Sequence, residues 1–205
     1  MTVTLAELVK DVMARIAEES GAYFDEDTIK RWLNEGERVI VRQTRILQDI
    51  AETHATKGRA EYPLPRWFWM PRLVMYDDDV LNPIDVERMA REKNSGSPTH
   101  YAVWRNSLWI HPAPSESMKL VRAFFYAWPR GMVEDTDRPD IPEAFHGLLV
   151  TWAAYRAKQA DQAVAEAQAL LSEFQQGIME IVRATAEDHA QGHIVREVWQ
   201  PEGLF

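Results

Sequence analysis

Apolar positions recur every three to four residues at both ends of the chain, which is the spacing of amphipathic helices. Near the N-terminus, Thr4 and Glu7 form a T-L-A-E capping box, and a helix is predicted to run from there to about Ser20. A second helix is predicted after Asp25, which would complete an αα-hairpin. The apolar positions of this second helix are Ile29, Trp32, Leu33, Val39, Ile40 and Leu47.

The middle of the chain, from Gly58 to about Trp128, replaces this period with alternation and is rich in proline and aromatic residues. Such a pattern is typical of strands. The clearest signal is YAVWRNSLWIHP, a hairpin with Arg105-Asn106 or Asn106-Ser107 at its turn. Residues 85–93 are compatible with one short helix. The predicted strands span residues 61–64, 71–76, 100–104, 108–111 and 118–128.

The helical period returns after the segment DTDRPDIP. Pro142 suits the first position of a third helix. A break near Asp161 separates this helix from a long, alanine-rich fourth helix. Beyond Gly192 the apolar residues follow no sustained period, so an extended tail is expected.

Together these patterns predict a mainly α fold. Two helices from each end of the chain would form a four-helix bundle, and an antiparallel β subdomain would be inserted between the pairs. The expected segments are 1–55 for the first helical pair, 56–140 for the β-rich insert, 141–190 for the second pair and 191–205 for the tail.

Composition narrows the classes of function. The chain has no cysteine, which excludes disulfides, thiolate catalysis and cysteine-based zinc sites. Its net charge is −9, carried by the two ends, while residues 56–140 are neutral. Binding to phosphate backbones needs clustered lysine and arginine, so a nucleic-acid reader is disfavoured. No stretch reaches the ~20 apolar residues of a membrane helix, and the first residues lack the basic start of a signal peptide. We expect a protein that acts without a membrane.

Candidate catalytic chemistry is sparse. The segment DTDRPD brings Asp135, Asp137 and Asp140 close in sequence, and His100 and His111 end the predicted hairpin. The spacing lacks the glycine and terminal glutamate of a calcium loop, so turn and capping roles are favoured. The adjacent aspartates 77–79 are interpreted as a solvated turn. We therefore expect no catalytic residue, metal or cofactor, and a small metal-dependent hydrolase built on these aspartates remains a remote alternative.

The densest aromatic cluster is RWFWMP. On a strand, Trp67 and Trp69 would share one face and Phe68 would take the other. Without a basic groove beside them, packing in a core or between subunits is favoured over stacking on bases.

Five segments follow one another in a distinctive order over most of residues 4 to 162: TLAELVKDVMARI, WLNEGERVIVRQT, GRAEYPLP, SGSPTHYAVWRNSLWIHPAP and DTDRPDIPEAFHGLLVTWAAYRAKQAD. In this order and spacing the chain resembles the head-to-tail connector, or adaptor, proteins of tailed bacteriophages.

The resemblance implies a structural virion protein. Twelve copies would form a closed ring at the head–tail junction, with the portal protein on one side and a tail or tail-nozzle protein on the other. DNA would pass through the ring without sequence-specific binding, and assembly would take place in the cytoplasm of the bacterial host. The alternative is a phage tail-completion or other virion protein that forms no ring.

Such a ring needs contacts in which one face of a copy meets a different face of its neighbour. In RWLNEGERVIVRQTRIL, the acidic and basic residues Glu35, Glu37, Arg38, Arg42 and Arg45 are expected to lie off the apolar stripe. The three arginines are spaced to form one ridge. We predict that Glu35 and these arginines form a subunit interface with acidic partners in the last two helices, and a merely solvated face is the alternative.

The tail, residues 191–205, contains more apolar residues than a terminus without binding partners would need. Gly192, Pro201 and Gly203 interrupt any continuous helix that could bury them. We predict that it docks on the portal or on a neighbouring copy. The alternative is packing on its own bundle. The docking residues would be Ile194, Val195, Val198, Trp199, Leu204 and Phe205.

Overall fold

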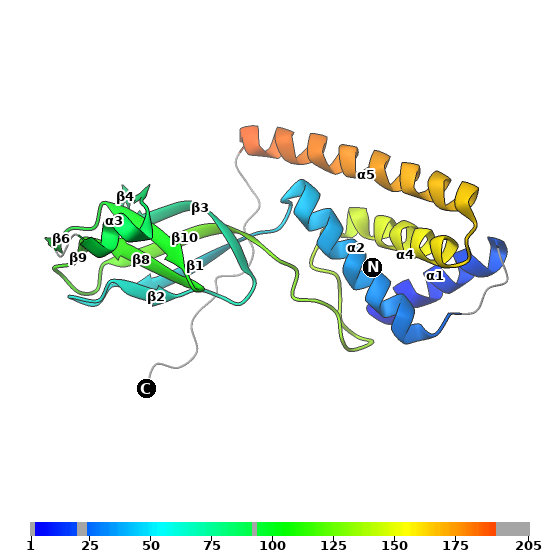
Figure 1. Cartoon of the computed structure of the whole chain (residues 1–205), viewed down its shortest axis with the longest axis horizontal. Coiled ribbons are helices and arrows are strands. Elements are labelled where there is room, and N and C mark those ends of the chain that lie inside the picture. Colours follow the sequence, from blue (N-terminus) through cyan, green and yellow to red (C-terminus); the bar gives the residue numbers. More distant parts are fainter. Residues whose placement is uncertain (1–2, 20–23, 92–93, 192–205) are drawn as a thin grey trace. The chain divides into compact units, whose positions relative to one another are not determined.

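The computed structural model describes residues 3–19, 24–91 and 94–191, and these form two compact units (Figure 1). The helical unit comprises the described residues up to Leu47 and from Trp128 onward. The β unit comprises Gln48–Ala127.

The helical unit contains four α-helices: α1 (Leu5–Glu19), α2 (Glu26–Thr44), α4 (His146–Ala160) and α5 (Val164–Gln191). Helix α4 packs against α1, α2 and α5, and follows a short 3-10 turn, η1 (Glu143–Phe145). Ala153, Ala154 and Ala157 of α4 are fully buried. Their small side chains let the neighbouring helices approach closely.

Close packing also explains two glycines. A Cβ added to Gly36 of α2 would lie 2.9 Å from Cδ1 of Trp152 in α4. A Cβ added to Gly177 of α5 would collide with the Leu148 side chain of α4. Each glycine therefore leaves room for a bulky side chain of α4.

The predicted starts of α1 and α2 are confirmed, whereas Pro142, predicted at the first position of the third helix, precedes the 3-10 turn η1, and α4 begins at His146. The Thr4 backbone N–H donates to Glu7 Oε2 at 2.8 Å, and the Glu7 N–H donates to Thr4 Oγ1 at 3.4 Å. Asp25 is the N-cap of α2 and accepts a hydrogen bond from the Thr28 N–H at 2.7 Å. The Thr28 backbone N–H lowers the pKa of the Asp25 carboxyl, because the hydrogen bond favours the charged form.

The β unit has two four-stranded sheets. The first has the order β1-β10-β3-β4, and the second the order β2-β8-β7-β5. Alternate residues of β10 are buried: Val121, Ala123, Phe125 and Ala127. The first sheet comprises β1 (Gln48–His54), β3 (Phe68–Tyr76), β4 (Asp79–Val80) and β10 (Leu120–Ala127), and the second β2 (Glu61–Pro63), β5 (Asn82–Pro83), β7 (His100–Trp104) and β8 (Ser107–His111).

Smaller elements complete the β unit. A third, two-stranded sheet pairs β6 (Ser95–Gly96) with β9 (Ala113–Pro114), and helix α3 spans Val86–Arg91. In the β7–β8 hairpin, Trp104 pairs with Ser107. The turn is therefore Arg105-Asn106, and both residues have positive φ values of 48° and 60°. This is the left-handed geometry that two-residue hairpin turns require.

The expectation of a mainly α fold built on a four-helix bundle was wrong. The chain is α+β, because its strands form three sheets within a compact unit that has its own buried residues. Two pairings, β5–β7 and β6–β9, are parallel, although an antiparallel insert was expected. Each of the five predicted strands has a counterpart in β2, β3, β7, β8 and β10, and the short helix is α3.

Strand β1 was missed by the sequence analysis. Its sequence, QDIAETH, directly follows the second helix, and it was counted within the first helical pair. Arg45 ends α2 in a left-handed conformation, and Leu47, taken as part of the helix, lies beyond it. A helical period cannot locate such an end, because it is set by the conformation of one residue.

Candidate interface site on helix α2

Helix α2 presents three different faces. Ile29, Leu33 and Ile40 are at most 1% exposed and form its core-facing stripe. A second face carries polar residues that bind the segment 128–141. The third carries exposed arginines. The two polar faces have different roles, and residue spacing along the helix does not distinguish them.

The second face fastens the segment 128–141 to α2. Lys30 Nζ lies 2.6 Å from Asp135 Oδ1, an ion pair that raises the pKa of Lys30, mainly through the hydrogen bond to Asp135. Asn34 donates from Nδ2 to the Met132 carbonyl oxygen at 2.9 Å and accepts from the Met132 N–H at 2.7 Å. The two hydrogen bonds of the Asn34 side-chain amide fix the position of the Met132 backbone against the helix.

Glu37 completes this face and corrects a prediction. Its side chain was expected to point outward with the arginines, but Glu37 is 1% exposed. Its Oε1 atom accepts hydrogen bonds from the backbone N–H groups of Asp140 at 2.5 Å and Ile141 at 3.2 Å. Asp140 in turn binds Arg130, with Nη2 and Oδ1 2.8 Å apart. A buried carboxylate therefore anchors the chain where it returns to the helical unit.

The third face borders an open hollow of about 740 Å³. Its floor and walls come from α2 and from the start of segment 128–141, all within the helical unit. Four arginines and four apolar residues contribute to the lining: Arg31, Arg38, Arg42, Arg130, Val39, Trp128, Met132 and Val133. We call it the arginine hollow.

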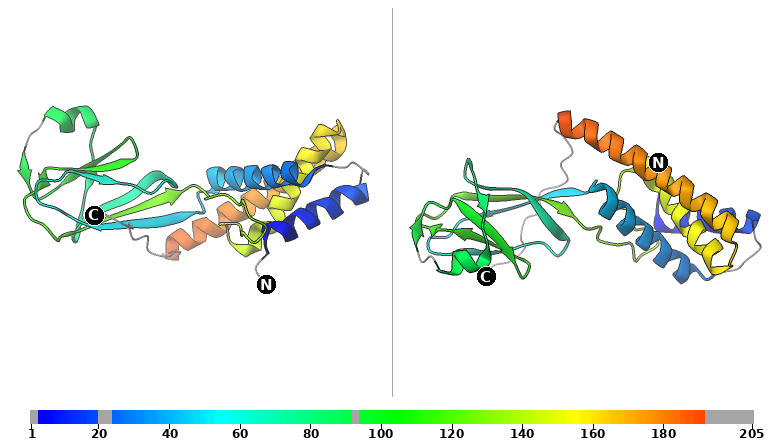
Figure 2. Two further views of the ribbon diagram at one scale, coloured as in Figure 1. Left: turned by 90° about the horizontal axis from the view of Figure 1, so that it is seen from below. Right: turned by 45° about the horizontal axis from the view of Figure 1, so that its top comes forward.

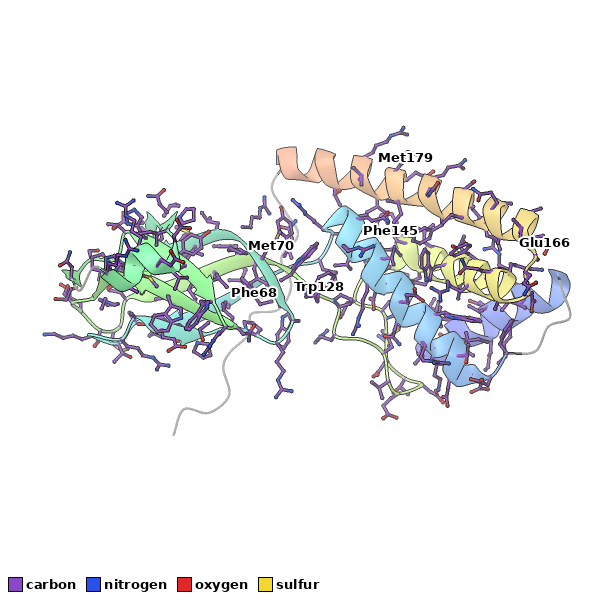
Figure 3. All side chains as sticks on the ribbon, viewed as in Figure 1. Phe68, Met70, Trp128, Phe145, Glu166 and Met179 are labelled. Carbon is purple, nitrogen blue, oxygen red and sulfur yellow. The ribbon has the colours of Figure 1, made fainter. Side chains whose placement is uncertain are left out.

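The charges of the arginine hollow are only partly compensated. Arg31 Nη2 donates to Thr28 Oγ1 at 2.7 Å, and Arg130 pairs with Asp140. In the part of the chain that the structure describes, the guanidinium groups of Arg38 and Arg42 make no hydrogen bond or ion pair. Two exposed cations thus lie beside apolar surface that includes Trp128, which Figure 3 labels, and Val133, which is 76% exposed.

The predicted interface residues do not all belong together. Arg38 and Arg42 line the hollow, as does Glu35, but the Glu35 carboxylate forms an ion pair with Arg156 of α4 at 2.5 Å. Arg45 is the C-cap of α2 with a φ of 53°, so it does not continue the helical ridge, and it is not part of the lining. The predicted tail residues Ile194, Val195, Val198, Trp199, Leu204 and Phe205 lie outside the described residues.

The aspartates considered for metal chemistry have structural partners. Asp137 accepts from the backbone N–H groups of Val133 at 2.7 Å and Glu134 at 2.8 Å, which hold the pKa of its carboxyl below the ordinary value. Asp77 forms an ion pair with Lys119 at 2.6 Å. Within residues 3–19, 24–91 and 94–191, no three histidine, aspartate or glutamate side chains form a group suited to a metal ion.

The aromatic cluster has local packing roles. Trp67 Nε1 donates to Asp49 Oδ2 at 2.8 Å, and the Phe68 ring lies 5.0 Å from the Phe125 ring. Strand β3 begins at Phe68, so the expected alternation does not include Trp67. None of the helices searched, over the described residues, has the length and apolar character to cross a membrane.

Comparison with known protein families identifies the chain. The model of the SU10 adaptor protein family matches residues 3–196, which is nearly the whole chain. A comparison of the chain with curated proteins found no match. The match extends through both units and includes the arginine hollow and the segment fastened by Glu37. The chain therefore belongs to the SU10 adaptor protein family and is a structural head-to-tail adaptor of a phage.

Proposed function

We propose that this adaptor assembles as a closed ring of twelve copies between the portal and the tail. The ring would continue the DNA channel and provide the docking surface for tail components. The observation that carries the proposal is the arginine hollow, where Arg38 and Arg42 are unpaired beside Trp128 and Val133. Arginine and tryptophan are the residues that most often dominate binding energy at protein interfaces.

A ring contact has to be heterologous, so the hollow would face a different surface of the next copy. In this arrangement Arg38 and Arg42 form the subunit contact. Glu35 would contribute through its ion pair with Arg156, which holds one wall of the hollow in place. Arg45, beyond the helix end, would lie at the margin of the contact.

Passage of DNA is consistent with the charge distribution. The ends of the chain, which supply the helical unit, carry most of the net charge of −9. A negatively charged lumen repels phosphates and would let DNA slide without specific binding. The tail residues from Ile194 to Phe205 would dock on the portal or a neighbouring copy, and the ring would be assembled in the host cytoplasm and carried in the virion.

Mass measurement of the purified full-length chain, alone and with the portal protein of the same phage, tests this function. We expect a complex in which many copies of the adaptor join one portal ring, with a single dominant stoichiometry. A chain that binds the portal as one copy would act as a tail-completion protein, and that result would refute the ring. Absence of binding to the portal would refute the adaptor position itself.

A further inference from the structure

Within the described residues, β1 is the longest outer strand of the β unit. In the first sheet its described neighbour is β10 alone, and it spans seven residues, whereas the opposite outer strand, β4, spans two. The outer strands of the second sheet, β2 and β5, span three and two residues. In Figure 2, β1 is the light-blue strand that enters the β unit from α2. A long outer strand presents a row of backbone groups on which a further strand can form.

The hydrogen-bond pattern shows which backbone groups of β1 point away from β10. The two strands are antiparallel, so successive residues of β1 bond to β10 and face the outer edge in alternation. The Ala55 N–H donates to the Lys119 carbonyl oxygen at 2.7 Å, which places the odd-numbered residues in the bonded positions. The N–H and carbonyl groups of Ile50, Glu52 and His54 therefore point to the outer edge.

The chain itself satisfies this edge at only one of these N–H groups. Asp49 Oδ1 accepts the Ile50 N–H at 2.8 Å. Within the described residues, no hydrogen bond serves the outward groups of Glu52 and His54. The Glu52 carboxylate also has no ion pair there, and Arg122, opposite it on β10, binds the turn between β3 and β4 instead. A strand added at this edge would therefore meet open backbone groups and one unpaired negative charge.

A segment with the composition of a strand lies outside the described residues. Residues 194–199 have the sequence IVREVW, in which four of six residues are β-branched or aromatic, and Gly192 and Pro201 lie on either side. This pattern is typical of a strand bounded by breakers. The other stretches outside the described residues hold at most four residues each, which is too few for such a strand.

We propose that residues 194–199 of one copy add as an antiparallel strand to the outer edge of β1 in the next copy of the ring. Arg196 lies opposite Glu52 in this pairing and neutralises its unpaired carboxylate. Val198 then lies opposite Ile50, so that two apolar side chains meet across the strands. Each copy gives one strand and receives one, as a head-to-tail ring requires. This inference rests on the proposed ring and names the surface on which the tail docks.

A proline on β1 tests the added backbone hydrogen bonds. Glu52→Pro removes one outward N–H and leaves the hydrogen bonds to β10 in place. Glu52→Ala is the matched control, because it removes the same carboxylate and keeps the N–H. We expect similar midpoints of thermal unfolding for the two chains, and the proline chain should need roughly tenfold more adaptor for half-assembly on the portal. Equal assembly by the two folded chains would overturn the strand addition.

Single-cysteine variants test the pairing directly, because the chain has no cysteine, and they decide the case in which the proline chain does not fold. His54→Cys and Ile194→Cys chains are purified separately, mixed, assembled on the portal protein and oxidised. Hydrogen-bonded antiparallel partners have Cα atoms about 5.5 Å apart, which is within reach of a disulfide. We expect a disulfide-linked dimer that contains one chain of each kind.

Two control positions fix the edge and the direction of the added strand. Glu61→Cys lies on β2, the exposed outer strand of the second sheet, and should not crosslink to Ile194→Cys. Val198→Cys lies about 14 Å further along the added strand and should not crosslink to His54→Cys. Crosslinking of Val198→Cys in place of Ile194→Cys would overturn the antiparallel pairing.

The outcomes separate this contact from the ring itself. A ring in which Ile194→Cys crosslinks to His54→Cys no more than to Glu61→Cys would overturn the contact and leave the ring intact. Crosslinking of Ile194→Cys to the portal protein would also overturn it, as would a disulfide closed within one chain that carries both His54→Cys and Ile194→Cys. If no ring forms on the portal, the proposed function fails, and the contact fails with it.

Discussion

Replacement of Glu37 by alanine should destabilise the helical unit more than any surface change on α2. The carboxylate is buried and accepts hydrogen bonds from the N–H groups of Asp140 and Ile141. Its removal leaves two buried donors without this acceptor, and each such donor costs roughly 1–3 kcal/mol. We expect a loss of about 3 kcal/mol. Glu37→Gln keeps an oxygen acceptor and should lose only about 1 kcal/mol.

The matched control is Glu35→Ala on the same helix. It makes the same change in helix propensity but removes only a partly exposed ion pair with Arg156, so it should cost less than about 1 kcal/mol. Thermal unfolding followed by circular dichroism at a helical wavelength measures both. For a chain of this size, about 3 kcal/mol lowers the midpoint by roughly 6–12 °C. Equal midpoints for the Glu37→Ala and Glu35→Ala chains would refute the anchoring role of the buried carboxylate.

Four further changes have definite expected outcomes. The double variant Arg38→Glu/Arg42→Glu should lose assembly on the portal while its circular dichroism stays unchanged, and normal assembly would show that this face is only solvated. Gly177→Val should lower the midpoint of thermal unfolding, because its side chain collides with Leu148; an unchanged midpoint would contradict the close packing of α4 and α5. The pKa of Asp137 in the folded state lies below its ordinary value of 3.8, so the charged carboxylate stabilises the fold above pH 3.8, and this stabilisation is lost as the pH falls through the lowered pKa. Asp137→Asn should therefore reduce the loss of stability in acid. An acid-unfolding profile identical to that of the unchanged chain would count against the hydrogen bonds to the Asp137 carboxylate. Deletion of residues 192–205 should abolish attachment to the portal, whereas retained attachment would make the tail dispensable.

Local features of this protein were predictable from its sequence. The capping box of Thr4 and Glu7, the Asp25 cap and the presence of a hairpin turn near Asn106 depend on residues at most a few positions apart, although the sequence left open whether the turn was Arg105-Asn106 or Asn106-Ser107. Their energies are therefore encoded in a short stretch of chain. The order of segments was also enough to indicate the adaptor family that the family model supports.

The balance of helix and sheet was not settled by such local signals. The short strands of the β unit, such as β4, β5 and β6, span two residues each. Two residues carry no measurable alternation, so their pairing depends on the neighbouring strands that the fold supplies. A mainly α fold was therefore predicted where the tertiary structure is α+β.

The roles of the charged residues on α2 were decided by the tertiary structure as well. Glu37 and Arg38 are adjacent and equally polar, and no local pattern distinguishes them. Glu37 is buried because the backbone of Asp140, 103 residues later, supplies its hydrogen-bond donor. Arg38 stays exposed because it lines the open arginine hollow, and no carboxylate of the described segment 128–141 forms an ion pair with it. The sequence by itself determined where α2 begins and which of its residues form the apolar stripe. The segment 128–141 decided that Glu37 is a buried anchor and that Arg38 stays exposed, because these roles depend on contacts between residues far apart in the chain.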